Sequence, residues 1–226
     1  MLRVGLTGGL GSGKSTAAAM LARHGAYAIS ADELGRELME PGQEVYGAIV
    51  ERFGAGVVRG DGRLDRGELA RLAFAGGRVE ELNAIVHPAV IVEQERRIAE
   101  IGARNPEAVV VVESALIFET RYGEARDGNR GQGWRGRFDR LILVTAPEPV
   151  KVARFIRRAL ESGSGMGVVQ IEAEARRRLG QQIPDERKAP FCDYVLGNEG
   201  TVAELQGLVD GLWTVLSSVA REQQRF

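Results

Sequence analysis

The sequence contains a single cysteine, Cys192, so no disulfide can form within the chain. We interpret Cys192 as a small buried apolar residue rather than a reactive thiol. Apolar runs long enough to cross a bilayer are absent, and residues 1–6 lack the layout of a signal peptide. We therefore expect a cytoplasmic protein that has no membrane partner.

An excess of charge of either sign is also absent. The 30 lysines and arginines nearly balance the 31 aspartates and glutamates, which leaves a net charge of −1. Without a global basic field, nucleic acid is not an expected partner, and any anion must be bound by local groups. Lysine itself is rare, because only Lys14, Lys151 and Lys188 occur and every other basic residue is arginine.

Rare lysines are informative because lysine carries a compact point charge, whereas arginine presents a planar fork. A lysine in an arginine-rich chain can therefore mark a site that needs the smaller cation. Lys14 fits this hypothesis, since it lies in a glycine-rich segment. We interpret Lys151 as a solvated helix residue.

Stretches typical of strands alternate with stretches typical of helices, which predicts an α/β fold with a parallel sheet. The length of 226 residues suits one such domain with small inserted subdomains. The expected strands cover residues 3–7, 27–30, 109–112, 141–144 and 194–196. The third of these is four consecutive valines, which is typical of a strand buried on both faces.

Helical patterns fill most of the remaining chain. We expect a helix over residues 14–24, a mostly helical region over 32–104 with a long helix that begins near Pro88, and a last helix over 202–219. Residues 121–137 are rich in glycine and arginine and have no periodicity, so we expect an exposed loop there.

The first expected strand leads into the sequence GGLGSGKST at residues 8–16. This fits the phosphate-loop pattern of Gly, four residues and Gly-Lys-Ser, in which glycines let the backbone aim its N–H groups at a phosphate. The alternative is a glycine-rich turn that binds nothing, but the strand before it and the helix after it favour a nucleoside triphosphate. Lys14 would reach the β- and γ-phosphates, and Ser15 would bind Mg²⁺. The predicted phosphate-binding residues are Gly11, Ser12, Gly13, Lys14, Ser15 and Thr16.

Asp32 follows the second expected strand and admits two interpretations. Ligands of open parallel sheets bind at the carboxyl ends of the strands, so Asp32 could accept a proton from an attacking hydroxyl or help to hold Mg²⁺. Aspartate is equally a favoured helix N-cap. Position alone does not decide between these roles.

Three arginines, Arg154, Arg157 and Arg158, share one face of the helix expected after the fourth strand. Arginines aimed at a transferring phosphoryl group would stabilise its charge. In an arginine-rich chain, a solvated basic face is the stronger interpretation of these three residues taken alone.

The ordered series of motifs resembles the dephospho-coenzyme A kinase family over nearly the whole chain. The matching motifs are GLTGGLGSGKST at residues 5–16, Asp32 with Arg36, LNAIVHP at 82–88, LIFE at 116–119, Gln182 with Pro184 and Lys188, and DYVL at 193–196 with Asn198 and Gly200. The chain departs from the family at Ser30, Glu113 and Ala115, where Asp, Asp and Pro are common. We therefore assign only Ser15 to the metal.

The resemblance implies a P-loop kinase fold, in which helices flank a parallel five-stranded sheet and a helical acceptor-binding subdomain and a helical lid complete a single domain over residues 1–226. The implied core covers residues 1–31, 105–148 and 191–226, the acceptor-binding subdomain covers 32–104, and the lid covers 149–190.

The resemblance also implies an activity: ATP- and Mg²⁺-dependent phosphorylation of the ribose 3′-hydroxyl of dephospho-coenzyme A, which gives coenzyme A and ADP in the last step of coenzyme A biosynthesis. Asp32 would be the catalytic base, while Lys14, Arg154 and Arg158 would stabilise the transferring phosphoryl group. The implied acceptor-binding residues are Asp32, Arg36, Arg66, His87, Leu116 and Glu119.

Alternatives remain at several of these points. His87 could instead be a loop histidine that caps backbone groups before Pro88, and Arg66 an ordinary residue at a helix start. Another small-molecule P-loop kinase, acting on a nucleoside or nucleotide, would share the phosphate loop but not the segment 82–88. A nucleotide-dependent switch protein is a third reading, although a guanine-reading Asn-Lys-x-Asp element is absent. The sequence leaves open a monomer or a homo-oligomer.

Overall fold

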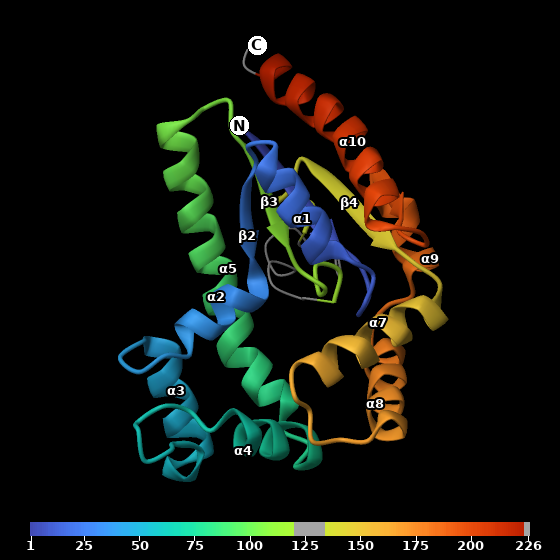
Figure 1. The fold of residues 1–226 in the computed structure, drawn as a ribbon. Helices are drawn as coiled ribbons and strands as arrows, with labels where there is room; N and C mark the ends of the chain where they lie inside the picture. The colour runs from blue at the N-terminus through green and yellow to red at the C-terminus, as the bar shows by residue number, and fades with distance from the viewer. Residues whose placement is uncertain (120–133, 224–226) are drawn as a thin grey trace. The chain divides into compact units, whose positions relative to one another are not determined.

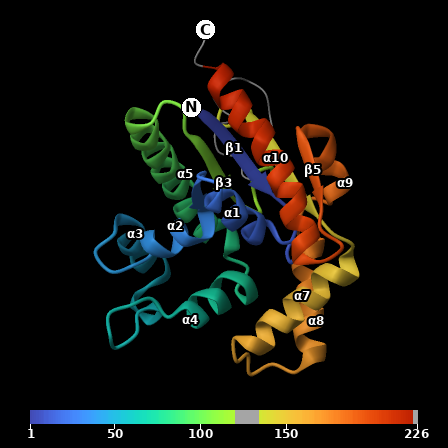
Figure 2. The ribbon, with the colours of Figure 1, turned by 45° about the horizontal axis from the view of Figure 1, so that its top comes forward.

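The five apolar stretches expected as strands form one sheet. The computed structural model describes residues 1–119 and 134–223. Its strands are β1 (Leu2–Thr7), β2 (Tyr27–Ser30), β3 (Val109–Glu113), β4 (Arg140–Thr145) and β5 (Tyr194–Gly197). They lie in the order β2-β3-β1-β4-β5, and the β1–β3, β1–β4 and β4–β5 pairs are parallel. Figure 1 labels β2, β3 and β4, and Figure 2 labels β1 and β5. The predicted parallel five-stranded sheet is confirmed.

The register of the central strands brings their carboxyl ends to one edge of the sheet. Leu6 of β1 is paired with Glu113 at the end of β3 and with Ile142 of β4. All five residues of β3 are buried, as expected for its valine run. The loop that follows β1 therefore begins beside the end of β3.

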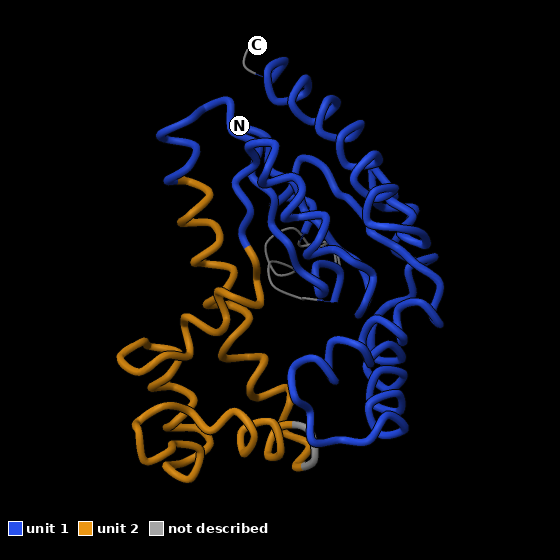
Figure 3. Tube along the Cα trace, viewed as in Figure 1, with its two compact units in different colours: residues 1–29, 100–226 blue, residues 30–99 orange. Residues whose placement is uncertain are grey.

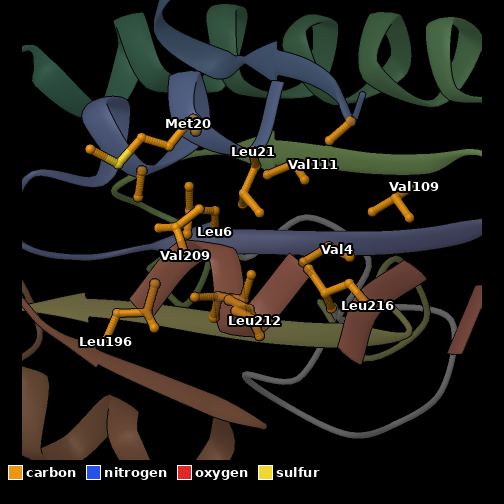
Figure 4. Packing of buried hydrophobic residues seen from close by; sticks show 14 of the residues in the cluster. Val4, Leu6, Met20, Leu21, Val109, Val111, Leu196, Val209, Leu212 and Leu216 are labelled. Atoms are coloured by element: carbon orange, nitrogen blue, oxygen red, sulfur yellow. The ribbon is translucent and has the colours of Figure 1, made fainter. Parts of the chain in front are cut away.

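Two helices cover one face of this sheet. They are α1 (Lys14–Arg23) and α10 (Val202–Glu222), and they run next to each other, roughly along the direction of the strands (Figure 2). Figure 4 shows the core between them and the sheet, where Leu6 and Val111 of the strands lie near Leu21 of α1 and Leu212 of α10. The buried residues of α10 recur every three or four positions, which is the spacing of one helix face.

The segment predicted as a lid, residues 149–190, also consists of helices. They are α7 (Glu148–Glu161), α8 (Val168–Gly180), α9 (Asp185–Lys188) and the 3-10 turn η3 (Ala189–Phe191). Helices α7 and α8 pack against each other, and α8 buries Ile171 and Ala175. These helices belong to the same compact unit as the sheet, which comprises residues 1–29 and 100–226 (Figure 3).

Residues 30–99 form a second compact unit with a core of its own (Figure 3). Its elements are α2 (Ala31–Leu38), α3 (Glu44–Phe53), the 3-10 turn η1 (Ala55–Val57), α4 (Arg66–Ala70), the π-helical turn η2 (Arg71–Ala75) and most of α5 (Val79–Arg104). Fully buried Ile49 and Val57 lie in that core. The mostly helical character predicted for residues 32–104 is confirmed.

The prediction that a helix begins near Pro88 is wrong, because α5 begins at Val79 and contains Pro88. Proline lacks an N–H donor and so interrupts the hydrogen-bond ladder of a helix. Here Leu82, Ile85 and Val86 recur at helical spacing and pack on the core of residues 30–99. This packing holds the first turns of the helix in place despite the proline.

Two further expectations concern other parts of the chain. The predicted last helix is confirmed and extends to Glu222. Most of the loop predicted over 121–137 lies outside the described residues, and residues 134–137 form a turn. Among the described helices, none combines the length and the apolarity that a bilayer crossing requires.

Candidate active site

The loop between β1 and α1 has the backbone shape that its glycines allow. Gly11 and Gly13 have positive φ angles of 73° and 96°, which residues with a side chain rarely adopt. A Cβ atom on Gly11 would lie 2.3 Å from the carbonyl oxygen of Lys151, and one on Gly13 would lie 2.1 Å from Asn198 Nδ2. Glycine is therefore required at both positions by conformation and by packing.

The amino end of α1 is suited to an anion. Gly13 occupies the N-cap without a side-chain cap, and the first turn contains no acidic residue. The first N–H groups of a helix and the positive end of its dipole are thus left for a ligand, as in phosphate-binding loops. Within the described residues, the buried Ser12 Oγ and Thr7 Oγ1 also have no hydrogen-bond partner. These groups fit a bound phosphate chain.

Lys14 and Ser15 at the start of α1 both lie next to Glu113, the last residue of β3. Ser15 Oγ donates a hydrogen bond to Glu113 Oε1 at 3.2 Å, and Lys14 Nζ is 3.8 Å from the same oxygen. Glu113 is only 5% exposed. Because the serine hydroxyl donates to the carboxylate, its lone pairs remain directed elsewhere and are suited to Mg²⁺.

A cavity of about 260 Å³ lies beside the loop, between α7 and the start of α10. Its lining includes Gly11, Gly13, Thr16, Arg154, Arg157, Arg158 and Asn198. Arg154 is held there by two hydrogen bonds to Asn198, from Nη1 to the carbonyl oxygen at 2.9 Å and from Nη2 to Oδ1 at 3.3 Å. Asn198 in turn donates to the carbonyl oxygen of Ser12 at 2.8 Å. One buried amide therefore links the lid arginine to the phosphate loop.

The prediction that Lys151 is a solvated helix residue is wrong. Lys151 lies in the first turn of α7, is only 8% exposed, and forms an ion pair with Asp185 of α9. Thr145 Oγ1 donates to the same carboxylate oxygen, Oδ2, at 2.7 Å. The error has a physical cause: the partner that makes burial of this ammonium possible is far away in the sequence.

Lys188 and Glu119 form a second buried pair. Lys188 is fully buried, its Nζ is 2.8 Å from Glu119 Oε1, and that oxygen also accepts from the backbone N–H of Ile183 at 3.1 Å. Leu116, in the same segment after β3, is half-buried. Glu119 therefore joins this segment to residues 183–188. The acceptor-binding role that the resemblance implies for Glu119 and Leu116 stays a prediction.

Cys192 lies four residues after Lys188 and is half-buried. Its Sγ is 3.4 Å from the carbonyl oxygen of Lys188. Burial, together with the neighbouring charge of Asp193, raises the pKa of the thiol to about 11. The structure agrees with an unreactive thiol.

In the unit of residues 30–99, Asp32 and Arg36 lie on α2. Ser30 is the N-cap of this helix and its side chain accepts from the backbone N–H of Glu33 at 3.4 Å, so the N-cap alternative for Asp32 is wrong. Asp32 and Arg36 are four residues apart on one helix face and both are exposed. The carboxylate of Asp32 is thus accessible in the first turn of α2.

The same unit contains the other two predicted acceptor residues. Arg66 is the first residue of α4, as its alternative reading held, and it also lines a cavity of about 320 Å³ together with Arg59 and Arg63. Its Nη2 is 3.5 Å from Glu40 Oε1. His87 lies within α5 rather than in a loop, and burial lowers the pKa of its imidazole.

Sequence reasoning missed several residues that contact the phosphate loop. Asn198 and Gln182 were matched to the family without a role, yet Gln182 Oε1 accepts from the N–H of Leu10 at 3.0 Å and Asn198 holds Ser12. Glu113 was given no role, yet the structure places it beside Ser15 and Lys14 at the end of β3. Asp185 offered no signal in the sequence.

The loop between β1 and α1, the carboxylate at the end of β3 and the parallel sheet define a P-loop kinase fold. The solved structure of a dephospho-CoA kinase from Campylobacter jejuni shares this fold, with a TM-score of 0.60 at 17% identity over 96% of this chain and 97% of that one. A crystal structure from Thermus thermophilus superposes with a TM-score of 0.69 at 32% identity, covering 95% of this chain and 97% of the other.

Sequence comparison narrows the class. The dephospho-CoA kinase (CoaE) family profile matches residues 2–204. A dephospho-CoA kinase of Corynebacterium jeikeium is 37% identical over 215 residues, which cover 94% of this chain and 98% of that protein. The chain belongs to the dephospho-CoA kinase family. It is accordingly an enzyme, a transferase of a family that uses ATP.

Proposed function

We propose that this protein transfers the γ-phosphoryl group of ATP to the ribose 3′-hydroxyl of dephospho-CoA, which gives CoA and ADP. ATP as the phosphoryl donor is supported by the arrangement of Lys14, Ser15 and Glu113 at the uncapped amino end of α1. The acceptor is inferred from the names of the relatives, which are dephospho-CoA kinases over almost the whole chain.

On the donor side, the backbone of residues 11–16 would hold the phosphates and Lys14 would offset charge on the β- and γ-phosphoryl groups. Mg²⁺, when bound, would neutralise part of the remaining phosphate charge. Ser15 Oγ would be a ligand of this ion, and Glu113 would orient the serine hydroxyl and accept from the ion's water.

Asp32 would take the proton of the attacking hydroxyl. Its carboxylate is exposed in the first turn of α2, directly after β2, and makes no hydrogen bond or ion pair within the described part of the chain. Such a group can accept a substrate proton without first breaking a protein contact. Arg36, on the same face of α2, would bind a phosphate of the acceptor.

The lid arginines would stabilise the transferred group. Arg154 is oriented by Asn198 and lines the cavity beside the phosphate loop, and exposed Arg158 lines it too. Charge-assisted hydrogen bonds from preorganised arginines act most strongly where charge is shared among phosphoryl oxygens. We assign Arg154 and Arg158 to this role.

For the acceptor, we propose Arg66, His87, Leu116 and Glu119, with Arg66 as the main anchor. Dephospho-CoA carries a diphosphate, and the cavity that Arg66 lines with Arg59 and Arg63 offers three guanidinium groups. The half-buried imidazole of His87, whose pKa is lowered by burial, would be neutral at pH 7 and could exchange a hydrogen bond with a hydroxyl or amide.

The test is a coupled assay of ADP release with ATP and Mg²⁺ over an acceptor panel. The panel contains dephospho-CoA, adenosine, uridine, AMP and a control without acceptor. We expect ADP release only with dephospho-CoA, together with one equivalent of CoA detected by mass. Release without acceptor, or only with a nucleoside or nucleotide, would disprove the assignment of the acceptor.

A further inference from the structure

The buried pair of Lys151 and Asp185 has no part in the mechanism described above, although it lies against the phosphate loop. Lys151 is 8% exposed and Asp185 is 7% exposed. Taking an ammonium and a carboxylate out of water costs more than an exposed pair does, and it is compensated only by close and well-directed contacts. Those contacts come from Thr145, at the end of β4, which donates to the shared carboxylate oxygen at 2.7 Å.

Two glycines of the loop, Gly9 and Gly11, lie close to the pair. A Cβ atom on Gly9 would lie 3.2 Å from Lys151 Nζ and 3.6 Å from Asp185 Oδ1. The carbonyl oxygen of Lys151 would lie 2.3 Å from a Cβ atom on Gly11. Between these glycines, the N–H of Leu10 donates to Gln182 Oε1, which itself lies 3.5 Å from the Cβ position of Gly9. The outer side of the loop therefore rests on this polar group.

We propose that Lys151 and Asp185 form a positioning pair beside residues 9–11, in which the charge of the lysine favours the bound triphosphate and the charge of the aspartate limits that attraction. This inference rests on the use of ATP in the proposed function, but not on the identity of the acceptor. Lys151 acts on the nucleotide through its positive charge and through its contact with the loop. Asp185 holds the ammonium in its ion pair and so keeps it from binding the phosphates directly.

Removing the charge of one partner should change nucleotide binding in the opposite direction from removing the charge of the other, which a role in packing alone would not produce. Without Lys151, the carboxylate of Asp185 is left beside the loop and repels a polyanion. Without the charge of Asp185, the ammonium of Lys151 is left there and attracts it. A pair that served only to pack the lid would weaken nucleotide binding in both cases.

The size of the cation matters as well as its charge. A Cβ atom on Gly9 would lie 3.2 Å from the ammonium, and the lysine side chain is only 10% exposed, so little space remains between the ammonium and the loop. A guanidinium is broader and planar and cannot occupy the same position without moving Gly9. This accounts for a lysine at this position in a chain that otherwise uses arginine.

The experiment measures the dissociation constant of a non-hydrolysable ATP analogue with Mg²⁺ by calorimetry, for the full chain and four variants. We expect Lys151→Met to weaken binding about five- to tenfold and Asp185→Asn to leave it equal or tighter, because the two variants leave opposite charges near the loop. The double variant Lys151→Met/Asp185→Asn should return to within about threefold of the natural protein.

The fourth variant, Lys151→Arg, keeps the positive charge beside Asp185. It therefore tests the proposal even if the variants that remove a charge fail to fold. We expect it to weaken binding at least about threefold while its thermal midpoint changes little. The matched control is Arg176→Met, which breaks an exposed ion pair with Glu148 and Glu172 on the same lid helices and should not change binding.

Equal weakening by Lys151→Met and Asp185→Asn, in proportion to their losses of thermal stability, would overturn the proposal. So would a Lys151→Arg variant that binds the analogue like the natural protein. Since the analogue binds without an acceptor, failure of the proposed acceptor chemistry would appear in the ADP-release assay and would leave these binding constants intact.

Discussion

The two compact units of the chain carry positive charge in different ways. All three lysines lie in the unit of residues 1–29 and 100–226, and each is largely or fully buried next to a carboxylate. The pairs are Lys14–Glu113, Lys151–Asp185 and Lys188–Glu119. The unit of residues 30–99 contains no lysine, and the arginines of its ion pairs keep between 32% and 67% of their side chains exposed.

This difference in burial sets how much each ion pair contributes to stability. An exposed ion pair is screened by water and contributes about 0–1 kcal/mol, whereas breaking a buried pair leaves an uncompensated charge and costs about 3–5 kcal/mol. In the unit of residues 1–29 and 100–226, the carboxylate partner therefore fixes the position of each lysine. In the unit of residues 30–99, the arginines remain available to solvent and to an anionic ligand.

The largest expected effect comes from the unit that has no lysine. We expect Asp32→Asn to lower kcat by roughly 10²- to 10⁴-fold, because an amide cannot accept the substrate proton. The KM for ATP should change little, since the phosphates are held by residues 11–16. Steady-state kinetics with both substrates varied would check this, and an unchanged kcat would remove Asp32 as the base.

The next effect tests the buried pairs directly. Lys188→Met leaves Glu119 buried without its cation, so we expect the free energy of unfolding to fall by about 3–5 kcal/mol. Denaturant unfolding followed by circular dichroism would measure it. The matched control is Arg97→Met, which breaks ion pairs with Glu37 and Glu93 on the surface and should change stability only slightly. Similar losses of unfolding free energy in both variants would contradict the difference between the buried and the exposed ion pairs.

A smaller effect is expected from an exposed arginine that contacts the substrate. Arg66→Ala should raise the KM for dephospho-CoA about tenfold, equivalent to about 1.4 kcal/mol, through loss of a charge-assisted contact. The KM for ATP should stay the same. The control Arg71→Ala removes an equally exposed arginine of the same unit that does not line the cavity. An equal rise of both KM values in Arg66→Ala would contradict a specific acceptor contact.

The phosphate loop and the sheet could be predicted because their signals are local. Gly11, Gly13 and Lys14 have a fixed spacing between an expected strand and an expected helix. The valine run of β3 is typical of a strand that is buried on both faces of a sheet. These features need no knowledge of distant residues. The family motifs added the activity that the loop alone does not specify.

The parts that failed depend on contacts between distant residues. The burial of Lys151 requires Asp185, and the role of Asn198 requires Ser12, 186 positions away in the sequence. The start of α5 was misplaced because a local rule about Pro88 was outweighed by packing of the preceding turn on another core. Pattern reasoning has no access to such partners in a single sequence.

The smallest expected effect is a pH dependence in the unit of residues 30–99. Burial lowers the pKa of His87 in the folded state, while the charge of Glu80 opposes this shift. Below about pH 6.5, the imidazole therefore binds a proton in the unfolded chain but not in the folded chain. The contribution of His87 to the free energy of unfolding is thus fully present above that pH and is lost as the pH falls. We expect His87→Gln to flatten the slope of unfolding free energy between pH 7 and 5, with His24 retained in both proteins. An unchanged slope would show that His87 is not its source.

The half-buried Cys192 has a practical consequence for following the lid. Because the thiolate is the nucleophile, a thiol whose pKa is raised to about 11 is almost entirely protonated at neutral pH and alkylates slowly. Val169, near the start of α8, is 81% exposed, so a thiol introduced there by Val169→Cys would react first. A single fluorescent or spin label could thus be attached to the tip of the lid without removal of the protein's own cysteine.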